Sequence, residues 1–200
     1  EFEAGLNHLE VFKLPVRSWD EFVEIGTMLM KAKQEEKMPY DTLVLDTVDR
    51  WVDLANEEVV NRARAKFKAI EINSVGDVPN GAGWFMATEL ISNYLNKLEK
   101  LDCCVVLIGH LSVKEIKERT GSYHRESISI GGKMGEGFLH WSDHTLFAQA
   151  TRQGERIKRT IFTKPSQSRE GKSRGGMIPD GLEWGDDMSQ NYLKIRALFD

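Results

Sequence analysis

The sequence predicts an α/β fold, in which a mostly parallel sheet is flanked by helices and carries an antiparallel hairpin at its edge. Two apolar runs, residues 42–46 and 103–109, are continuous rather than alternating, as in parallel strands. The stretches between them have the spacing of amphipathic helices. Farther along, residues 145–151 and 156–162 alternate like paired strands, with Gln153-Gly154 in the turn. Strand–helix alternation followed by a hairpin is typical of this class.

The first elements are a short strand and a helix. Residues 10–16 are half apolar and are predicted to form the strand. Ser18 follows, and Glu21 comes three residues later, which is the spacing of a capping box at a helix start. The helix then has one apolar face, formed by Phe22, Ile25, Leu29 and Met30.

Two helices and a loop are predicted between the apolar runs. Residues 50–70 form the first helix, and residues 84–101 form the second. Residues 74–83 contain three glycines and a proline, which indicates a loop. Trp51 and Trp84 belong to these helices, and we expect both to pack in the core.

A polar segment follows the second apolar run. Residues 114–129 are rich in charge and show little periodicity, so we expect an irregular or mobile segment. Closely spaced glycines come next, at Gly131, Gly132, Gly135 and Gly137.

The composition is that of a single domain without a membrane anchor. The 200 residues are 40% hydrophobic and carry a net charge of −4, which gives no overall basic signature for nucleic acid. No apolar stretch approaches the ~18 residues that would span a bilayer. Cys103 and Cys104 are adjacent within an apolar run, and buried free thiols fit a reducing compartment. We therefore expect one domain over residues 1–200 in the cytoplasm.

Polar residues end both apolar runs. Asp46 closes the first, and His110 follows the second. In parallel sheets, ligands bind at the carboxyl ends of the strands, where a carboxylate can hold Mg²⁺ beside phosphates. Taken alone, Asp46 is equally consistent with a helix cap, and a lone His after a strand is more often structural. Their convergence at one sheet edge is what favours a site.

In order, these motifs resemble the RecA/RadA recombinase core, and more closely the RecA-like ATPases of phages linked to single-strand annealing. The opening Glu1-Phe2-Glu3-Ala4-Gly5-Leu6 is similar to the family's acid-x-acid-x-x-Leu motif. Residues 45–47 resemble its Walker B strand, and residues 129–133 its Gly-Gly after the second DNA loop. The resemblance implies that Glu3 activates water, Asp46 orders Mg²⁺ and His110 senses the γ-phosphate.

The resemblance also implies a function. It is that of a phage-encoded, RecA-like ATPase that binds ATP and Mg²⁺, acts on DNA in recombination or single-strand annealing, and assembles into a ring or filament in the host cytoplasm. Single-stranded DNA is the expected partner. Two alternatives stay open: a non-catalytic RecA-fold module that binds DNA or assembles, and a helicase-type motor of the same fold.

One motif of the family is missing from the sequence. G-x-x-x-x-G-K-[ST], the loop that binds phosphates, occurs nowhere in the 200 residues. In the family this loop precedes the acid-x-acid-x-x-Leu motif, which residues 1–6 of this sequence match. We therefore expect a RecA-like core that lacks its N-terminal phosphate-loop segment, and a chain that by itself hydrolyses ATP poorly.

A basic stretch lies near the C-terminal end. Residues 152–174 contain eight basic and two acidic side chains, in contrast to the acidic chain as a whole. Its first part, residues 152–159, is better explained as a solvated hairpin face. In the family, cations from the later part reach the ATP of the neighbouring subunit, and the resemblance implies this role for one of Lys164, Arg169, Lys172 and Arg174.

A second set of cations lies in residues 114–133, after His110. This segment is the candidate DNA loop, and Tyr123 and His124 could stack on bases there. Glu115, Glu118 and Glu126 weaken the case, and an ordinary mobile surface loop is the alternative. The predicted DNA-binding cations are Lys114, Lys117, Arg119, Arg125 and Lys133.

Overall fold

A computed structural model describes residues 12–119, 121–185, 190–191 and 193–194 of the chain. The residues group into two compact units. The first unit comprises Glu1–His110 and Ser129–Met134, and the second comprises Leu111–Ile128 and Gly135–Asp200. That residues 1–200 form one RecA-like core remains a prediction.

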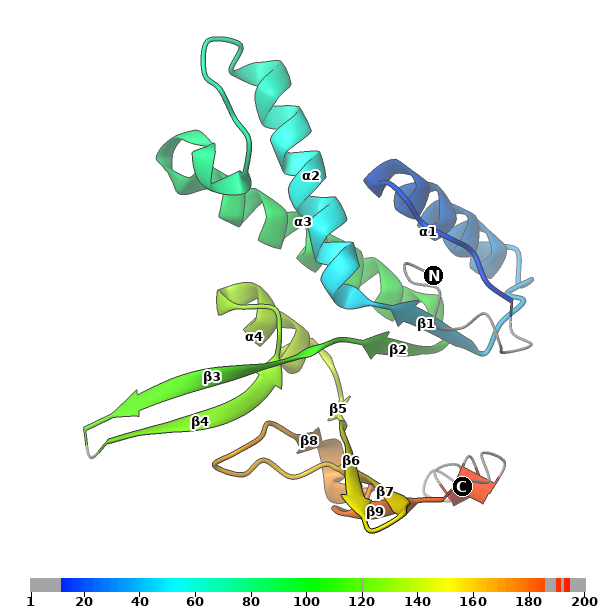
Figure 1. Cartoon of the computed structure of the whole chain (residues 1–200). Helices are drawn as coiled ribbons and strands as arrows, with labels where there is room; N and C mark the ends of the chain where they lie inside the picture. Colours follow the sequence, from blue (N-terminus) through cyan, green and yellow to red (C-terminus); the bar gives the residue numbers. More distant parts are fainter. Residues whose placement is uncertain (1–11, 120, 186–189, 192, 195–200) are drawn as a thin grey trace. The chain divides into compact units, whose positions relative to one another are not determined.

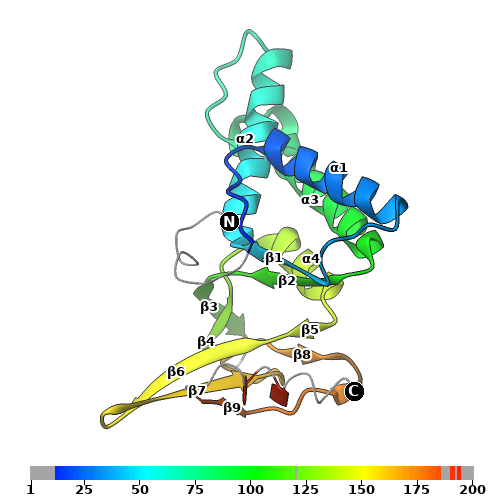
Figure 2. The same cartoon turned by 90° about the vertical axis from the view of Figure 1, so that its right-hand side faces the viewer.

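The first unit is built from three helices and a pair of strands, with the helices on the same side of the strands (Figures 1 and 2). Ser18 begins the first helix as predicted, since its hydroxyl accepts the Glu21 amide. In chain order the elements are α1 (Trp19–Gln34), β1 (Thr42–Asp46), α2 (Val48–Lys66), η2 (Val75–Asp77), η3 (Pro79–Gly81), α3 (Ala82–Leu98), η4 (Glu99–Leu101) and β2 (Cys104–Ile108).

The two strands of this unit are parallel, as predicted, and Asp46 pairs in register with Ile108. The expectation that both faces of the strands are covered is wrong within the described residues. The helices cover one face, where Leu45 is buried, whereas Val44 is 47% exposed and Ile108 41% exposed. The expected burial of the two cysteines also fails, because Cys103 is half-buried and Cys104 exposed, although both are free.

Aromatic side chains form the core between the helices. Phe22 of α1 lies 5.0 Å from the ring centre of Trp51 and 4.9 Å from that of Tyr94. Trp51 is fully buried, as are Leu54 on α2 and, on α3, Ile91. The predicted apolar faces therefore meet one another, and their burial is the main stabilising contribution of this unit.

Two sequence predictions in this unit need correction. The described part of residues 10–16, from Phe12 onward, contains no strand. The loop at residues 74–83 contains two short 3-10 helices, η2 and η3. Asp77 stabilises the start of η2 by accepting the amides of Asn73 and Ser74. Because these donors favour the charged carboxylate, they lower the pKa of Asp77.

The segment after His110 is an antiparallel hairpin, so the expectation of an irregular segment is wrong. β3 (Leu111–Glu118) pairs with β4 (Gly121–Ile128) along their whole length. Alternate residues of β3 are half-buried and exposed, which is the two-residue period of a strand. The sequence does not show this alternation of burial, because both faces of the strand carry polar and charged side chains.

The rest of the second unit is mostly antiparallel. The predicted hairpin is confirmed, with β6 (Phe147–Gln153) paired to β7 (Arg156–Phe162) and β7 to β9 (Leu182–Trp184). β5 (His144–Thr145) pairs with β8 (Lys172–Ser173), and η5 (Arg174–Gly176) follows. Helix α4 (Gly132–Trp141) has its first three residues in the first unit.

The fold is thus mixed α/β, as predicted, but its sheets are small. Among the described residues each sheet has two or three strands, and the large, mostly parallel sheet of the prediction is not seen. In the described part of the chain, no helix is both long enough and apolar enough to cross a membrane.

Candidate nucleotide site and basic loops

The carboxyl ends of β1 and β2 bring Asp46 and His110 to the same edge, as the sequence predicts for a parallel pair. Thr47 follows Asp46, and its buried hydroxyl caps α2 by accepting the Arg50 amide at 3.5 Å. The helix cap is therefore Thr47 and not Asp46. No hydrogen-bond or ion-pair partner for the Asp46 carboxylate is found among the described residues, which leaves its oxygens available to a ligand.

Asp49 is a member of this cluster that sequence reasoning missed. One carboxylate oxygen accepts the His110 amide at 2.9 Å and lies 3.2 Å from Nδ1 of the same residue. The other oxygen accepts the hydroxyl of Ser129. Its position three residues after Asp46, in the first turn of a helix, was the available signal. Its partners lie 61 and 80 residues away and could not be anticipated.

The donor set fits Mg²⁺ better than a metal held by protein groups alone. Among the residues that the structure describes, no group of three or more His, Cys, Asp or Glu side chains could hold a metal ion. Mg²⁺ does not need such a cage, because it is usually bound through one or two carboxylates, water and substrate phosphates. Asp46 offers one such carboxylate. Glu3, the predicted general base, lies outside the described residues.

A groove of about 740 Å³ opens in the first unit beside this cluster. Its wall includes Asp49, the Gly131-Gly132 pair and two aromatic side chains on the first turn of α3. Those aromatic residues, Trp84 and Phe85, are 59% and 70% exposed. The packing prediction is thus confirmed for Trp51 and wrong for Trp84.

The four cations proposed to act on a neighbouring subunit differ sharply in their surroundings. Lys172 donates to three backbone carbonyls at the end of α4, those of Leu139, His140 and Ser142, at 3.0, 3.1 and 2.6 Å. Because a cation here satisfies carbonyls that a helix end leaves without partners, Lys172 holds the fold of the second unit.

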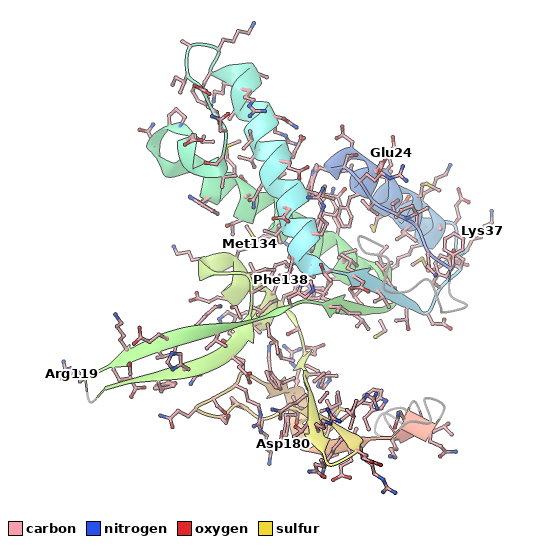
Figure 3. All side chains as sticks on the ribbon, in the orientation of Figure 1. Glu24, Lys37, Arg119, Met134, Phe138 and Asp180 are labelled. Atoms are coloured by element: carbon pink, nitrogen blue, oxygen red, sulfur yellow. The ribbon has the colours of Figure 1, made fainter. Side chains whose placement is uncertain are left out.

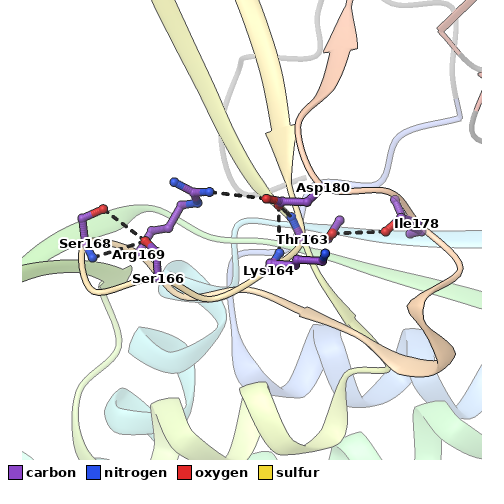
Figure 4. A network of polar contacts seen from close by, with 7 residues as sticks. All are labelled: Thr163, Lys164, Ser166, Ser168, Arg169, Ile178 and Asp180. Carbon is purple, nitrogen blue, oxygen red and sulfur yellow. Dashed lines mark hydrogen bonds and ion pairs between the residues drawn. The ribbon is translucent and has the colours of Figure 1, made fainter.

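Arg169 is held in place as well. Its guanidinium lies over the ring of Phe162, 3.8 Å from the ring centre, and 3.7 Å from the Asp180 carboxylate. Asp180 also accepts the backbone amides of Thr163 and Lys164 (Figure 4). Those two amides, with the Arg169 charge, lower the pKa of Asp180. Asp180 therefore ties residues 164–174, the basic loop, to the end of β7.

Lys164 and Arg174 are the more accessible pair. Arg174 is exposed and pairs with Asp143 at 2.5 Å. Lys164 is exposed, and its backbone amide donates to Asp180. Its ammonium makes no hydrogen bond or salt bridge among the described residues, although its charge helps to lower the pKa of Asp180. Of the four cations, Lys164 is the one whose side chain is most available to a ligand.

The predicted DNA-binding cations divide in the same way. Lys114 donates to Ser127 at 3.0 Å, and Arg125 donates to the hydroxyl of Tyr123 at 3.1 Å, so both serve the hairpin itself. Lys117, Arg119 and Lys133 are exposed. Arg119 lies at the tip of the β3–β4 ribbon (Figure 3).

The hairpin is also joined to the basic loop of the same unit. Ser127 donates to the Glu170 carboxylate at 2.8 Å, and the Glu126 amide donates to the Ser168 carbonyl at 2.8 Å. The Glu170 amide returns a bond to the Glu126 carbonyl. The candidate DNA segment and the candidate nucleotide-binding loop are therefore one hydrogen-bonded assembly.

A family model described as an AAA domain matches residues 1–175. The chain belongs to this AAA domain family of P-loop NTPases. The family membership agrees with the strand-end carboxylate, and it indicates nucleotide binding, typically with Mg²⁺. It does not resolve the RecA/RadA branch, which stays a proposal.

A relative comes from a prophage. Over 111 residues, 54% of this chain, the AAA domain is 27% identical to the SPbeta prophage-derived uncharacterized protein YorG of Bacillus subtilis (strain 168). The aligned part covers 32% of that protein, so the chain spans about a third of its length. No solved structure matches the chain.

Proposed function

We propose that this AAA domain is part of a RecA-like ATPase that acts on DNA, in phage recombination or single-strand annealing. The observation that carries the proposal is the meeting of Asp46 and His110 at the ends of two parallel strands. The family match supports an NTPase, and the prophage origin of YorG supports a phage context. The role in DNA rests on the resemblance and on the exposed cations of the β3–β4 hairpin.

In this proposal the strand ends bind the phosphates of ATP. Asp46 would hold Mg²⁺, usually through water, because its carboxylate sits at the strand end without a partner among the described residues. When bound, the metal neutralises charge on the phosphates. His110 would donate a hydrogen bond to the γ-phosphate, and Glu3 would take a proton from the attacking water.

The neighbouring subunit would complete the site with a cation. Lys164 is the best candidate, since Lys172 and Arg169 are held by their own unit. A lysine that reaches a phosphate across a boundary stabilises negative charge that develops there. Such a contribution requires a ring or filament of subunits.

DNA would bind to the exposed cations of the β3–β4 hairpin in the second unit, and Lys133 is a separate candidate in the first unit. Single-stranded DNA is the proposed ligand, because exposed cations with aromatic neighbours can bind the backbone while bases stack. The exposed Trp84 and Phe85 beside Lys133 add a second stacking surface in the first unit.

The experiment is an ATPase assay of the full-length protein with and without single-stranded DNA, followed by a strand-pairing assay. We expect ATP hydrolysis that single-stranded DNA stimulates, and pairing of complementary strands. Unwinding of a duplex with a single-stranded tail would instead identify a helicase-type motor. DNA binding without ATP hydrolysis would identify a non-catalytic module and refute the ATPase proposal.

A further inference from the structure

The chain leaves the first unit after His110 and returns to it at Ser129. Between these two points lies the whole β3–β4 hairpin. The Ser129 amide donates to the His110 carbonyl at 2.9 Å, so the two residues form a narrow neck. This neck is where the hairpin is covalently joined to β2 on one side and to residues 129–134 on the other.

Asp49 binds both sides of the neck with different oxygens. One oxygen takes the amide of His110 and faces its ring nitrogen, and the other takes the hydroxyl of Ser129. The side chain of Asp49 is only 23% exposed, so water competes weakly for these bonds. A carboxylate accepts from both sides with separate oxygens, whereas an amide would have to donate its NH2 to the Ser129 hydroxyl instead of accepting from it.

The clamp also sits on the turn that carries the strand-end carboxylate. Asp46 ends β1, Thr47 caps α2, and Asp49 lies in the first turn of that helix. A carboxylate near a helix N-terminus is favoured by the helix dipole. Direct hydrogen bonds therefore connect this turn to His110 and Ser129.

We propose that Asp49 is a positioning residue, which holds His110 in place and couples the nucleotide site at Asp46 to the β3–β4 hairpin. The coupling rests on the proposed ATPase function, whereas the clamp itself rests on the contacts of Asp49 alone. Asp49 acts through His110 and Ser129 and is not assigned a contact with nucleotide or DNA.

The test uses three variants of the full-length protein. Asp49→Ala removes both arms of the clamp, and Ser129→Ala removes one hydroxyl without disturbing the helix. The matched control is Glu89→Ala, because Glu89 is an exposed acid on α3 with no partner among the described residues. Ser129→Ala keeps the proposal testable should Asp49→Ala fold poorly.

The first readout is amide hydrogen exchange at the neck. We expect Asp49→Ala to raise exchange of the His110 and Ser129 amides about tenfold or more, Ser129→Ala to raise it less, and Glu89→Ala to leave it unchanged. Unchanged exchange in both clamp variants would overturn the proposal. Increased exchange throughout α2 and α3 as well would also overturn it, because it would mark a general loss of stability.

The second readout is the ratio of single-stranded DNA dissociation constants measured with and without a non-hydrolysable ATP analogue and Mg²⁺. We expect this ratio to move toward one in Asp49→Ala and to keep its wild-type value in Glu89→Ala. A wild-type ratio that survives in Asp49→Ala would refute the coupling. If the wild type binds no nucleotide, the proposed function fails and the coupling fails with it, while the exchange data still report separately on the clamp.

Discussion

Replacement of Lys172 by methionine should destabilise the second unit, although the sequence alone suggests a ligand-binding lysine. The ammonium donates to three carbonyls at the end of α4, at 3.0, 3.1 and 2.6 Å. Methionine keeps the apolar stem and removes the charge. A hydrogen bond to a charged group contributes about 1.5–3 kcal/mol, and a cation at a helix C-terminus adds about 0.3–1 kcal/mol.

The three carbonyls are partly exposed and can recruit water, so the bonds do not add fully. We expect a loss of about 2–3 kcal/mol, which in a chain of this size corresponds to a drop in Tm of about 5–10 °C. Thermal unfolding followed by circular dichroism measures it. The matched control is Lys164→Met, whose exposed ammonium makes no hydrogen bond or salt bridge among the described residues and whose loss should change stability by less than about 0.5 kcal/mol.

The pair of variants also separates structure from function. Lys164→Met should reduce ATP hydrolysis in the full-length protein while its Tm stays at the wild-type value. An unchanged Tm in Lys172→Met would refute the reasoning, because it would show that the three carbonyl contacts contribute nothing measurable. Equal losses of Tm in both variants would refute it too.

Three further predictions concern Gly83, the cations of the β3–β4 hairpin, and Asp180. Gly83→Ala should destabilise the first unit by about 2–3 kcal/mol in chemical denaturation, because an added Cβ would lie 2.0 Å from a backbone oxygen. The double variant Lys117→Ala, Arg119→Ala should weaken single-stranded DNA binding and reduce the salt dependence of log K by roughly 1.4, whereas Lys31→Ala should leave both at wild-type values. An unaltered salt dependence would contradict the proposal that the hairpin binds DNA. Asp180, whose lowered pKa reflects bonds from two backbone amides, should stabilise the fold at pH values above its ordinary pKa of about 3.9, and this stability should fade as the pH falls below that value. The gap in Tm between wild type and Asp180→Asn should therefore narrow in acid, and a constant gap would contradict the assignment.

The elements predicted best are those whose apolar pattern is local. β1 has the predicted bounds, and β7 begins and ends where the alternation does. Helix ends are less accurate, because α2 begins at its cap, Thr47, and stops at Lys66, before the expected end. The caps and turns that set these ends depend on a few polar contacts rather than on periodicity.

The hairpin and the clamp could not be predicted for a different reason. β3 and β4 alternate between polar side chains on both faces, so the apolar alternation that marks a strand is missing. The roles of Asp49, Lys172 and Arg169 depend on partners distant in the chain or on backbone carbonyls. The family resemblance implied ligand binding for one of the four cations at residues 164–174 without choosing among them, and only their contacts separate them.

The central claim is that Asp46 is the magnesium carboxylate of an NTPase, and one comparison tests it directly. Asp46→Asn and Asp41→Asn are matched variants at opposite ends of β1. Asp46 is the last residue of the strand, and Asp41 immediately precedes its first residue. In the full-length protein, Asp46→Asn should reduce the ATPase kcat by about 100-fold or more, since it removes the charge that holds Mg²⁺. Asp41→Asn should retain the wild-type rate. Wild-type hydrolysis in Asp46→Asn would contradict the account.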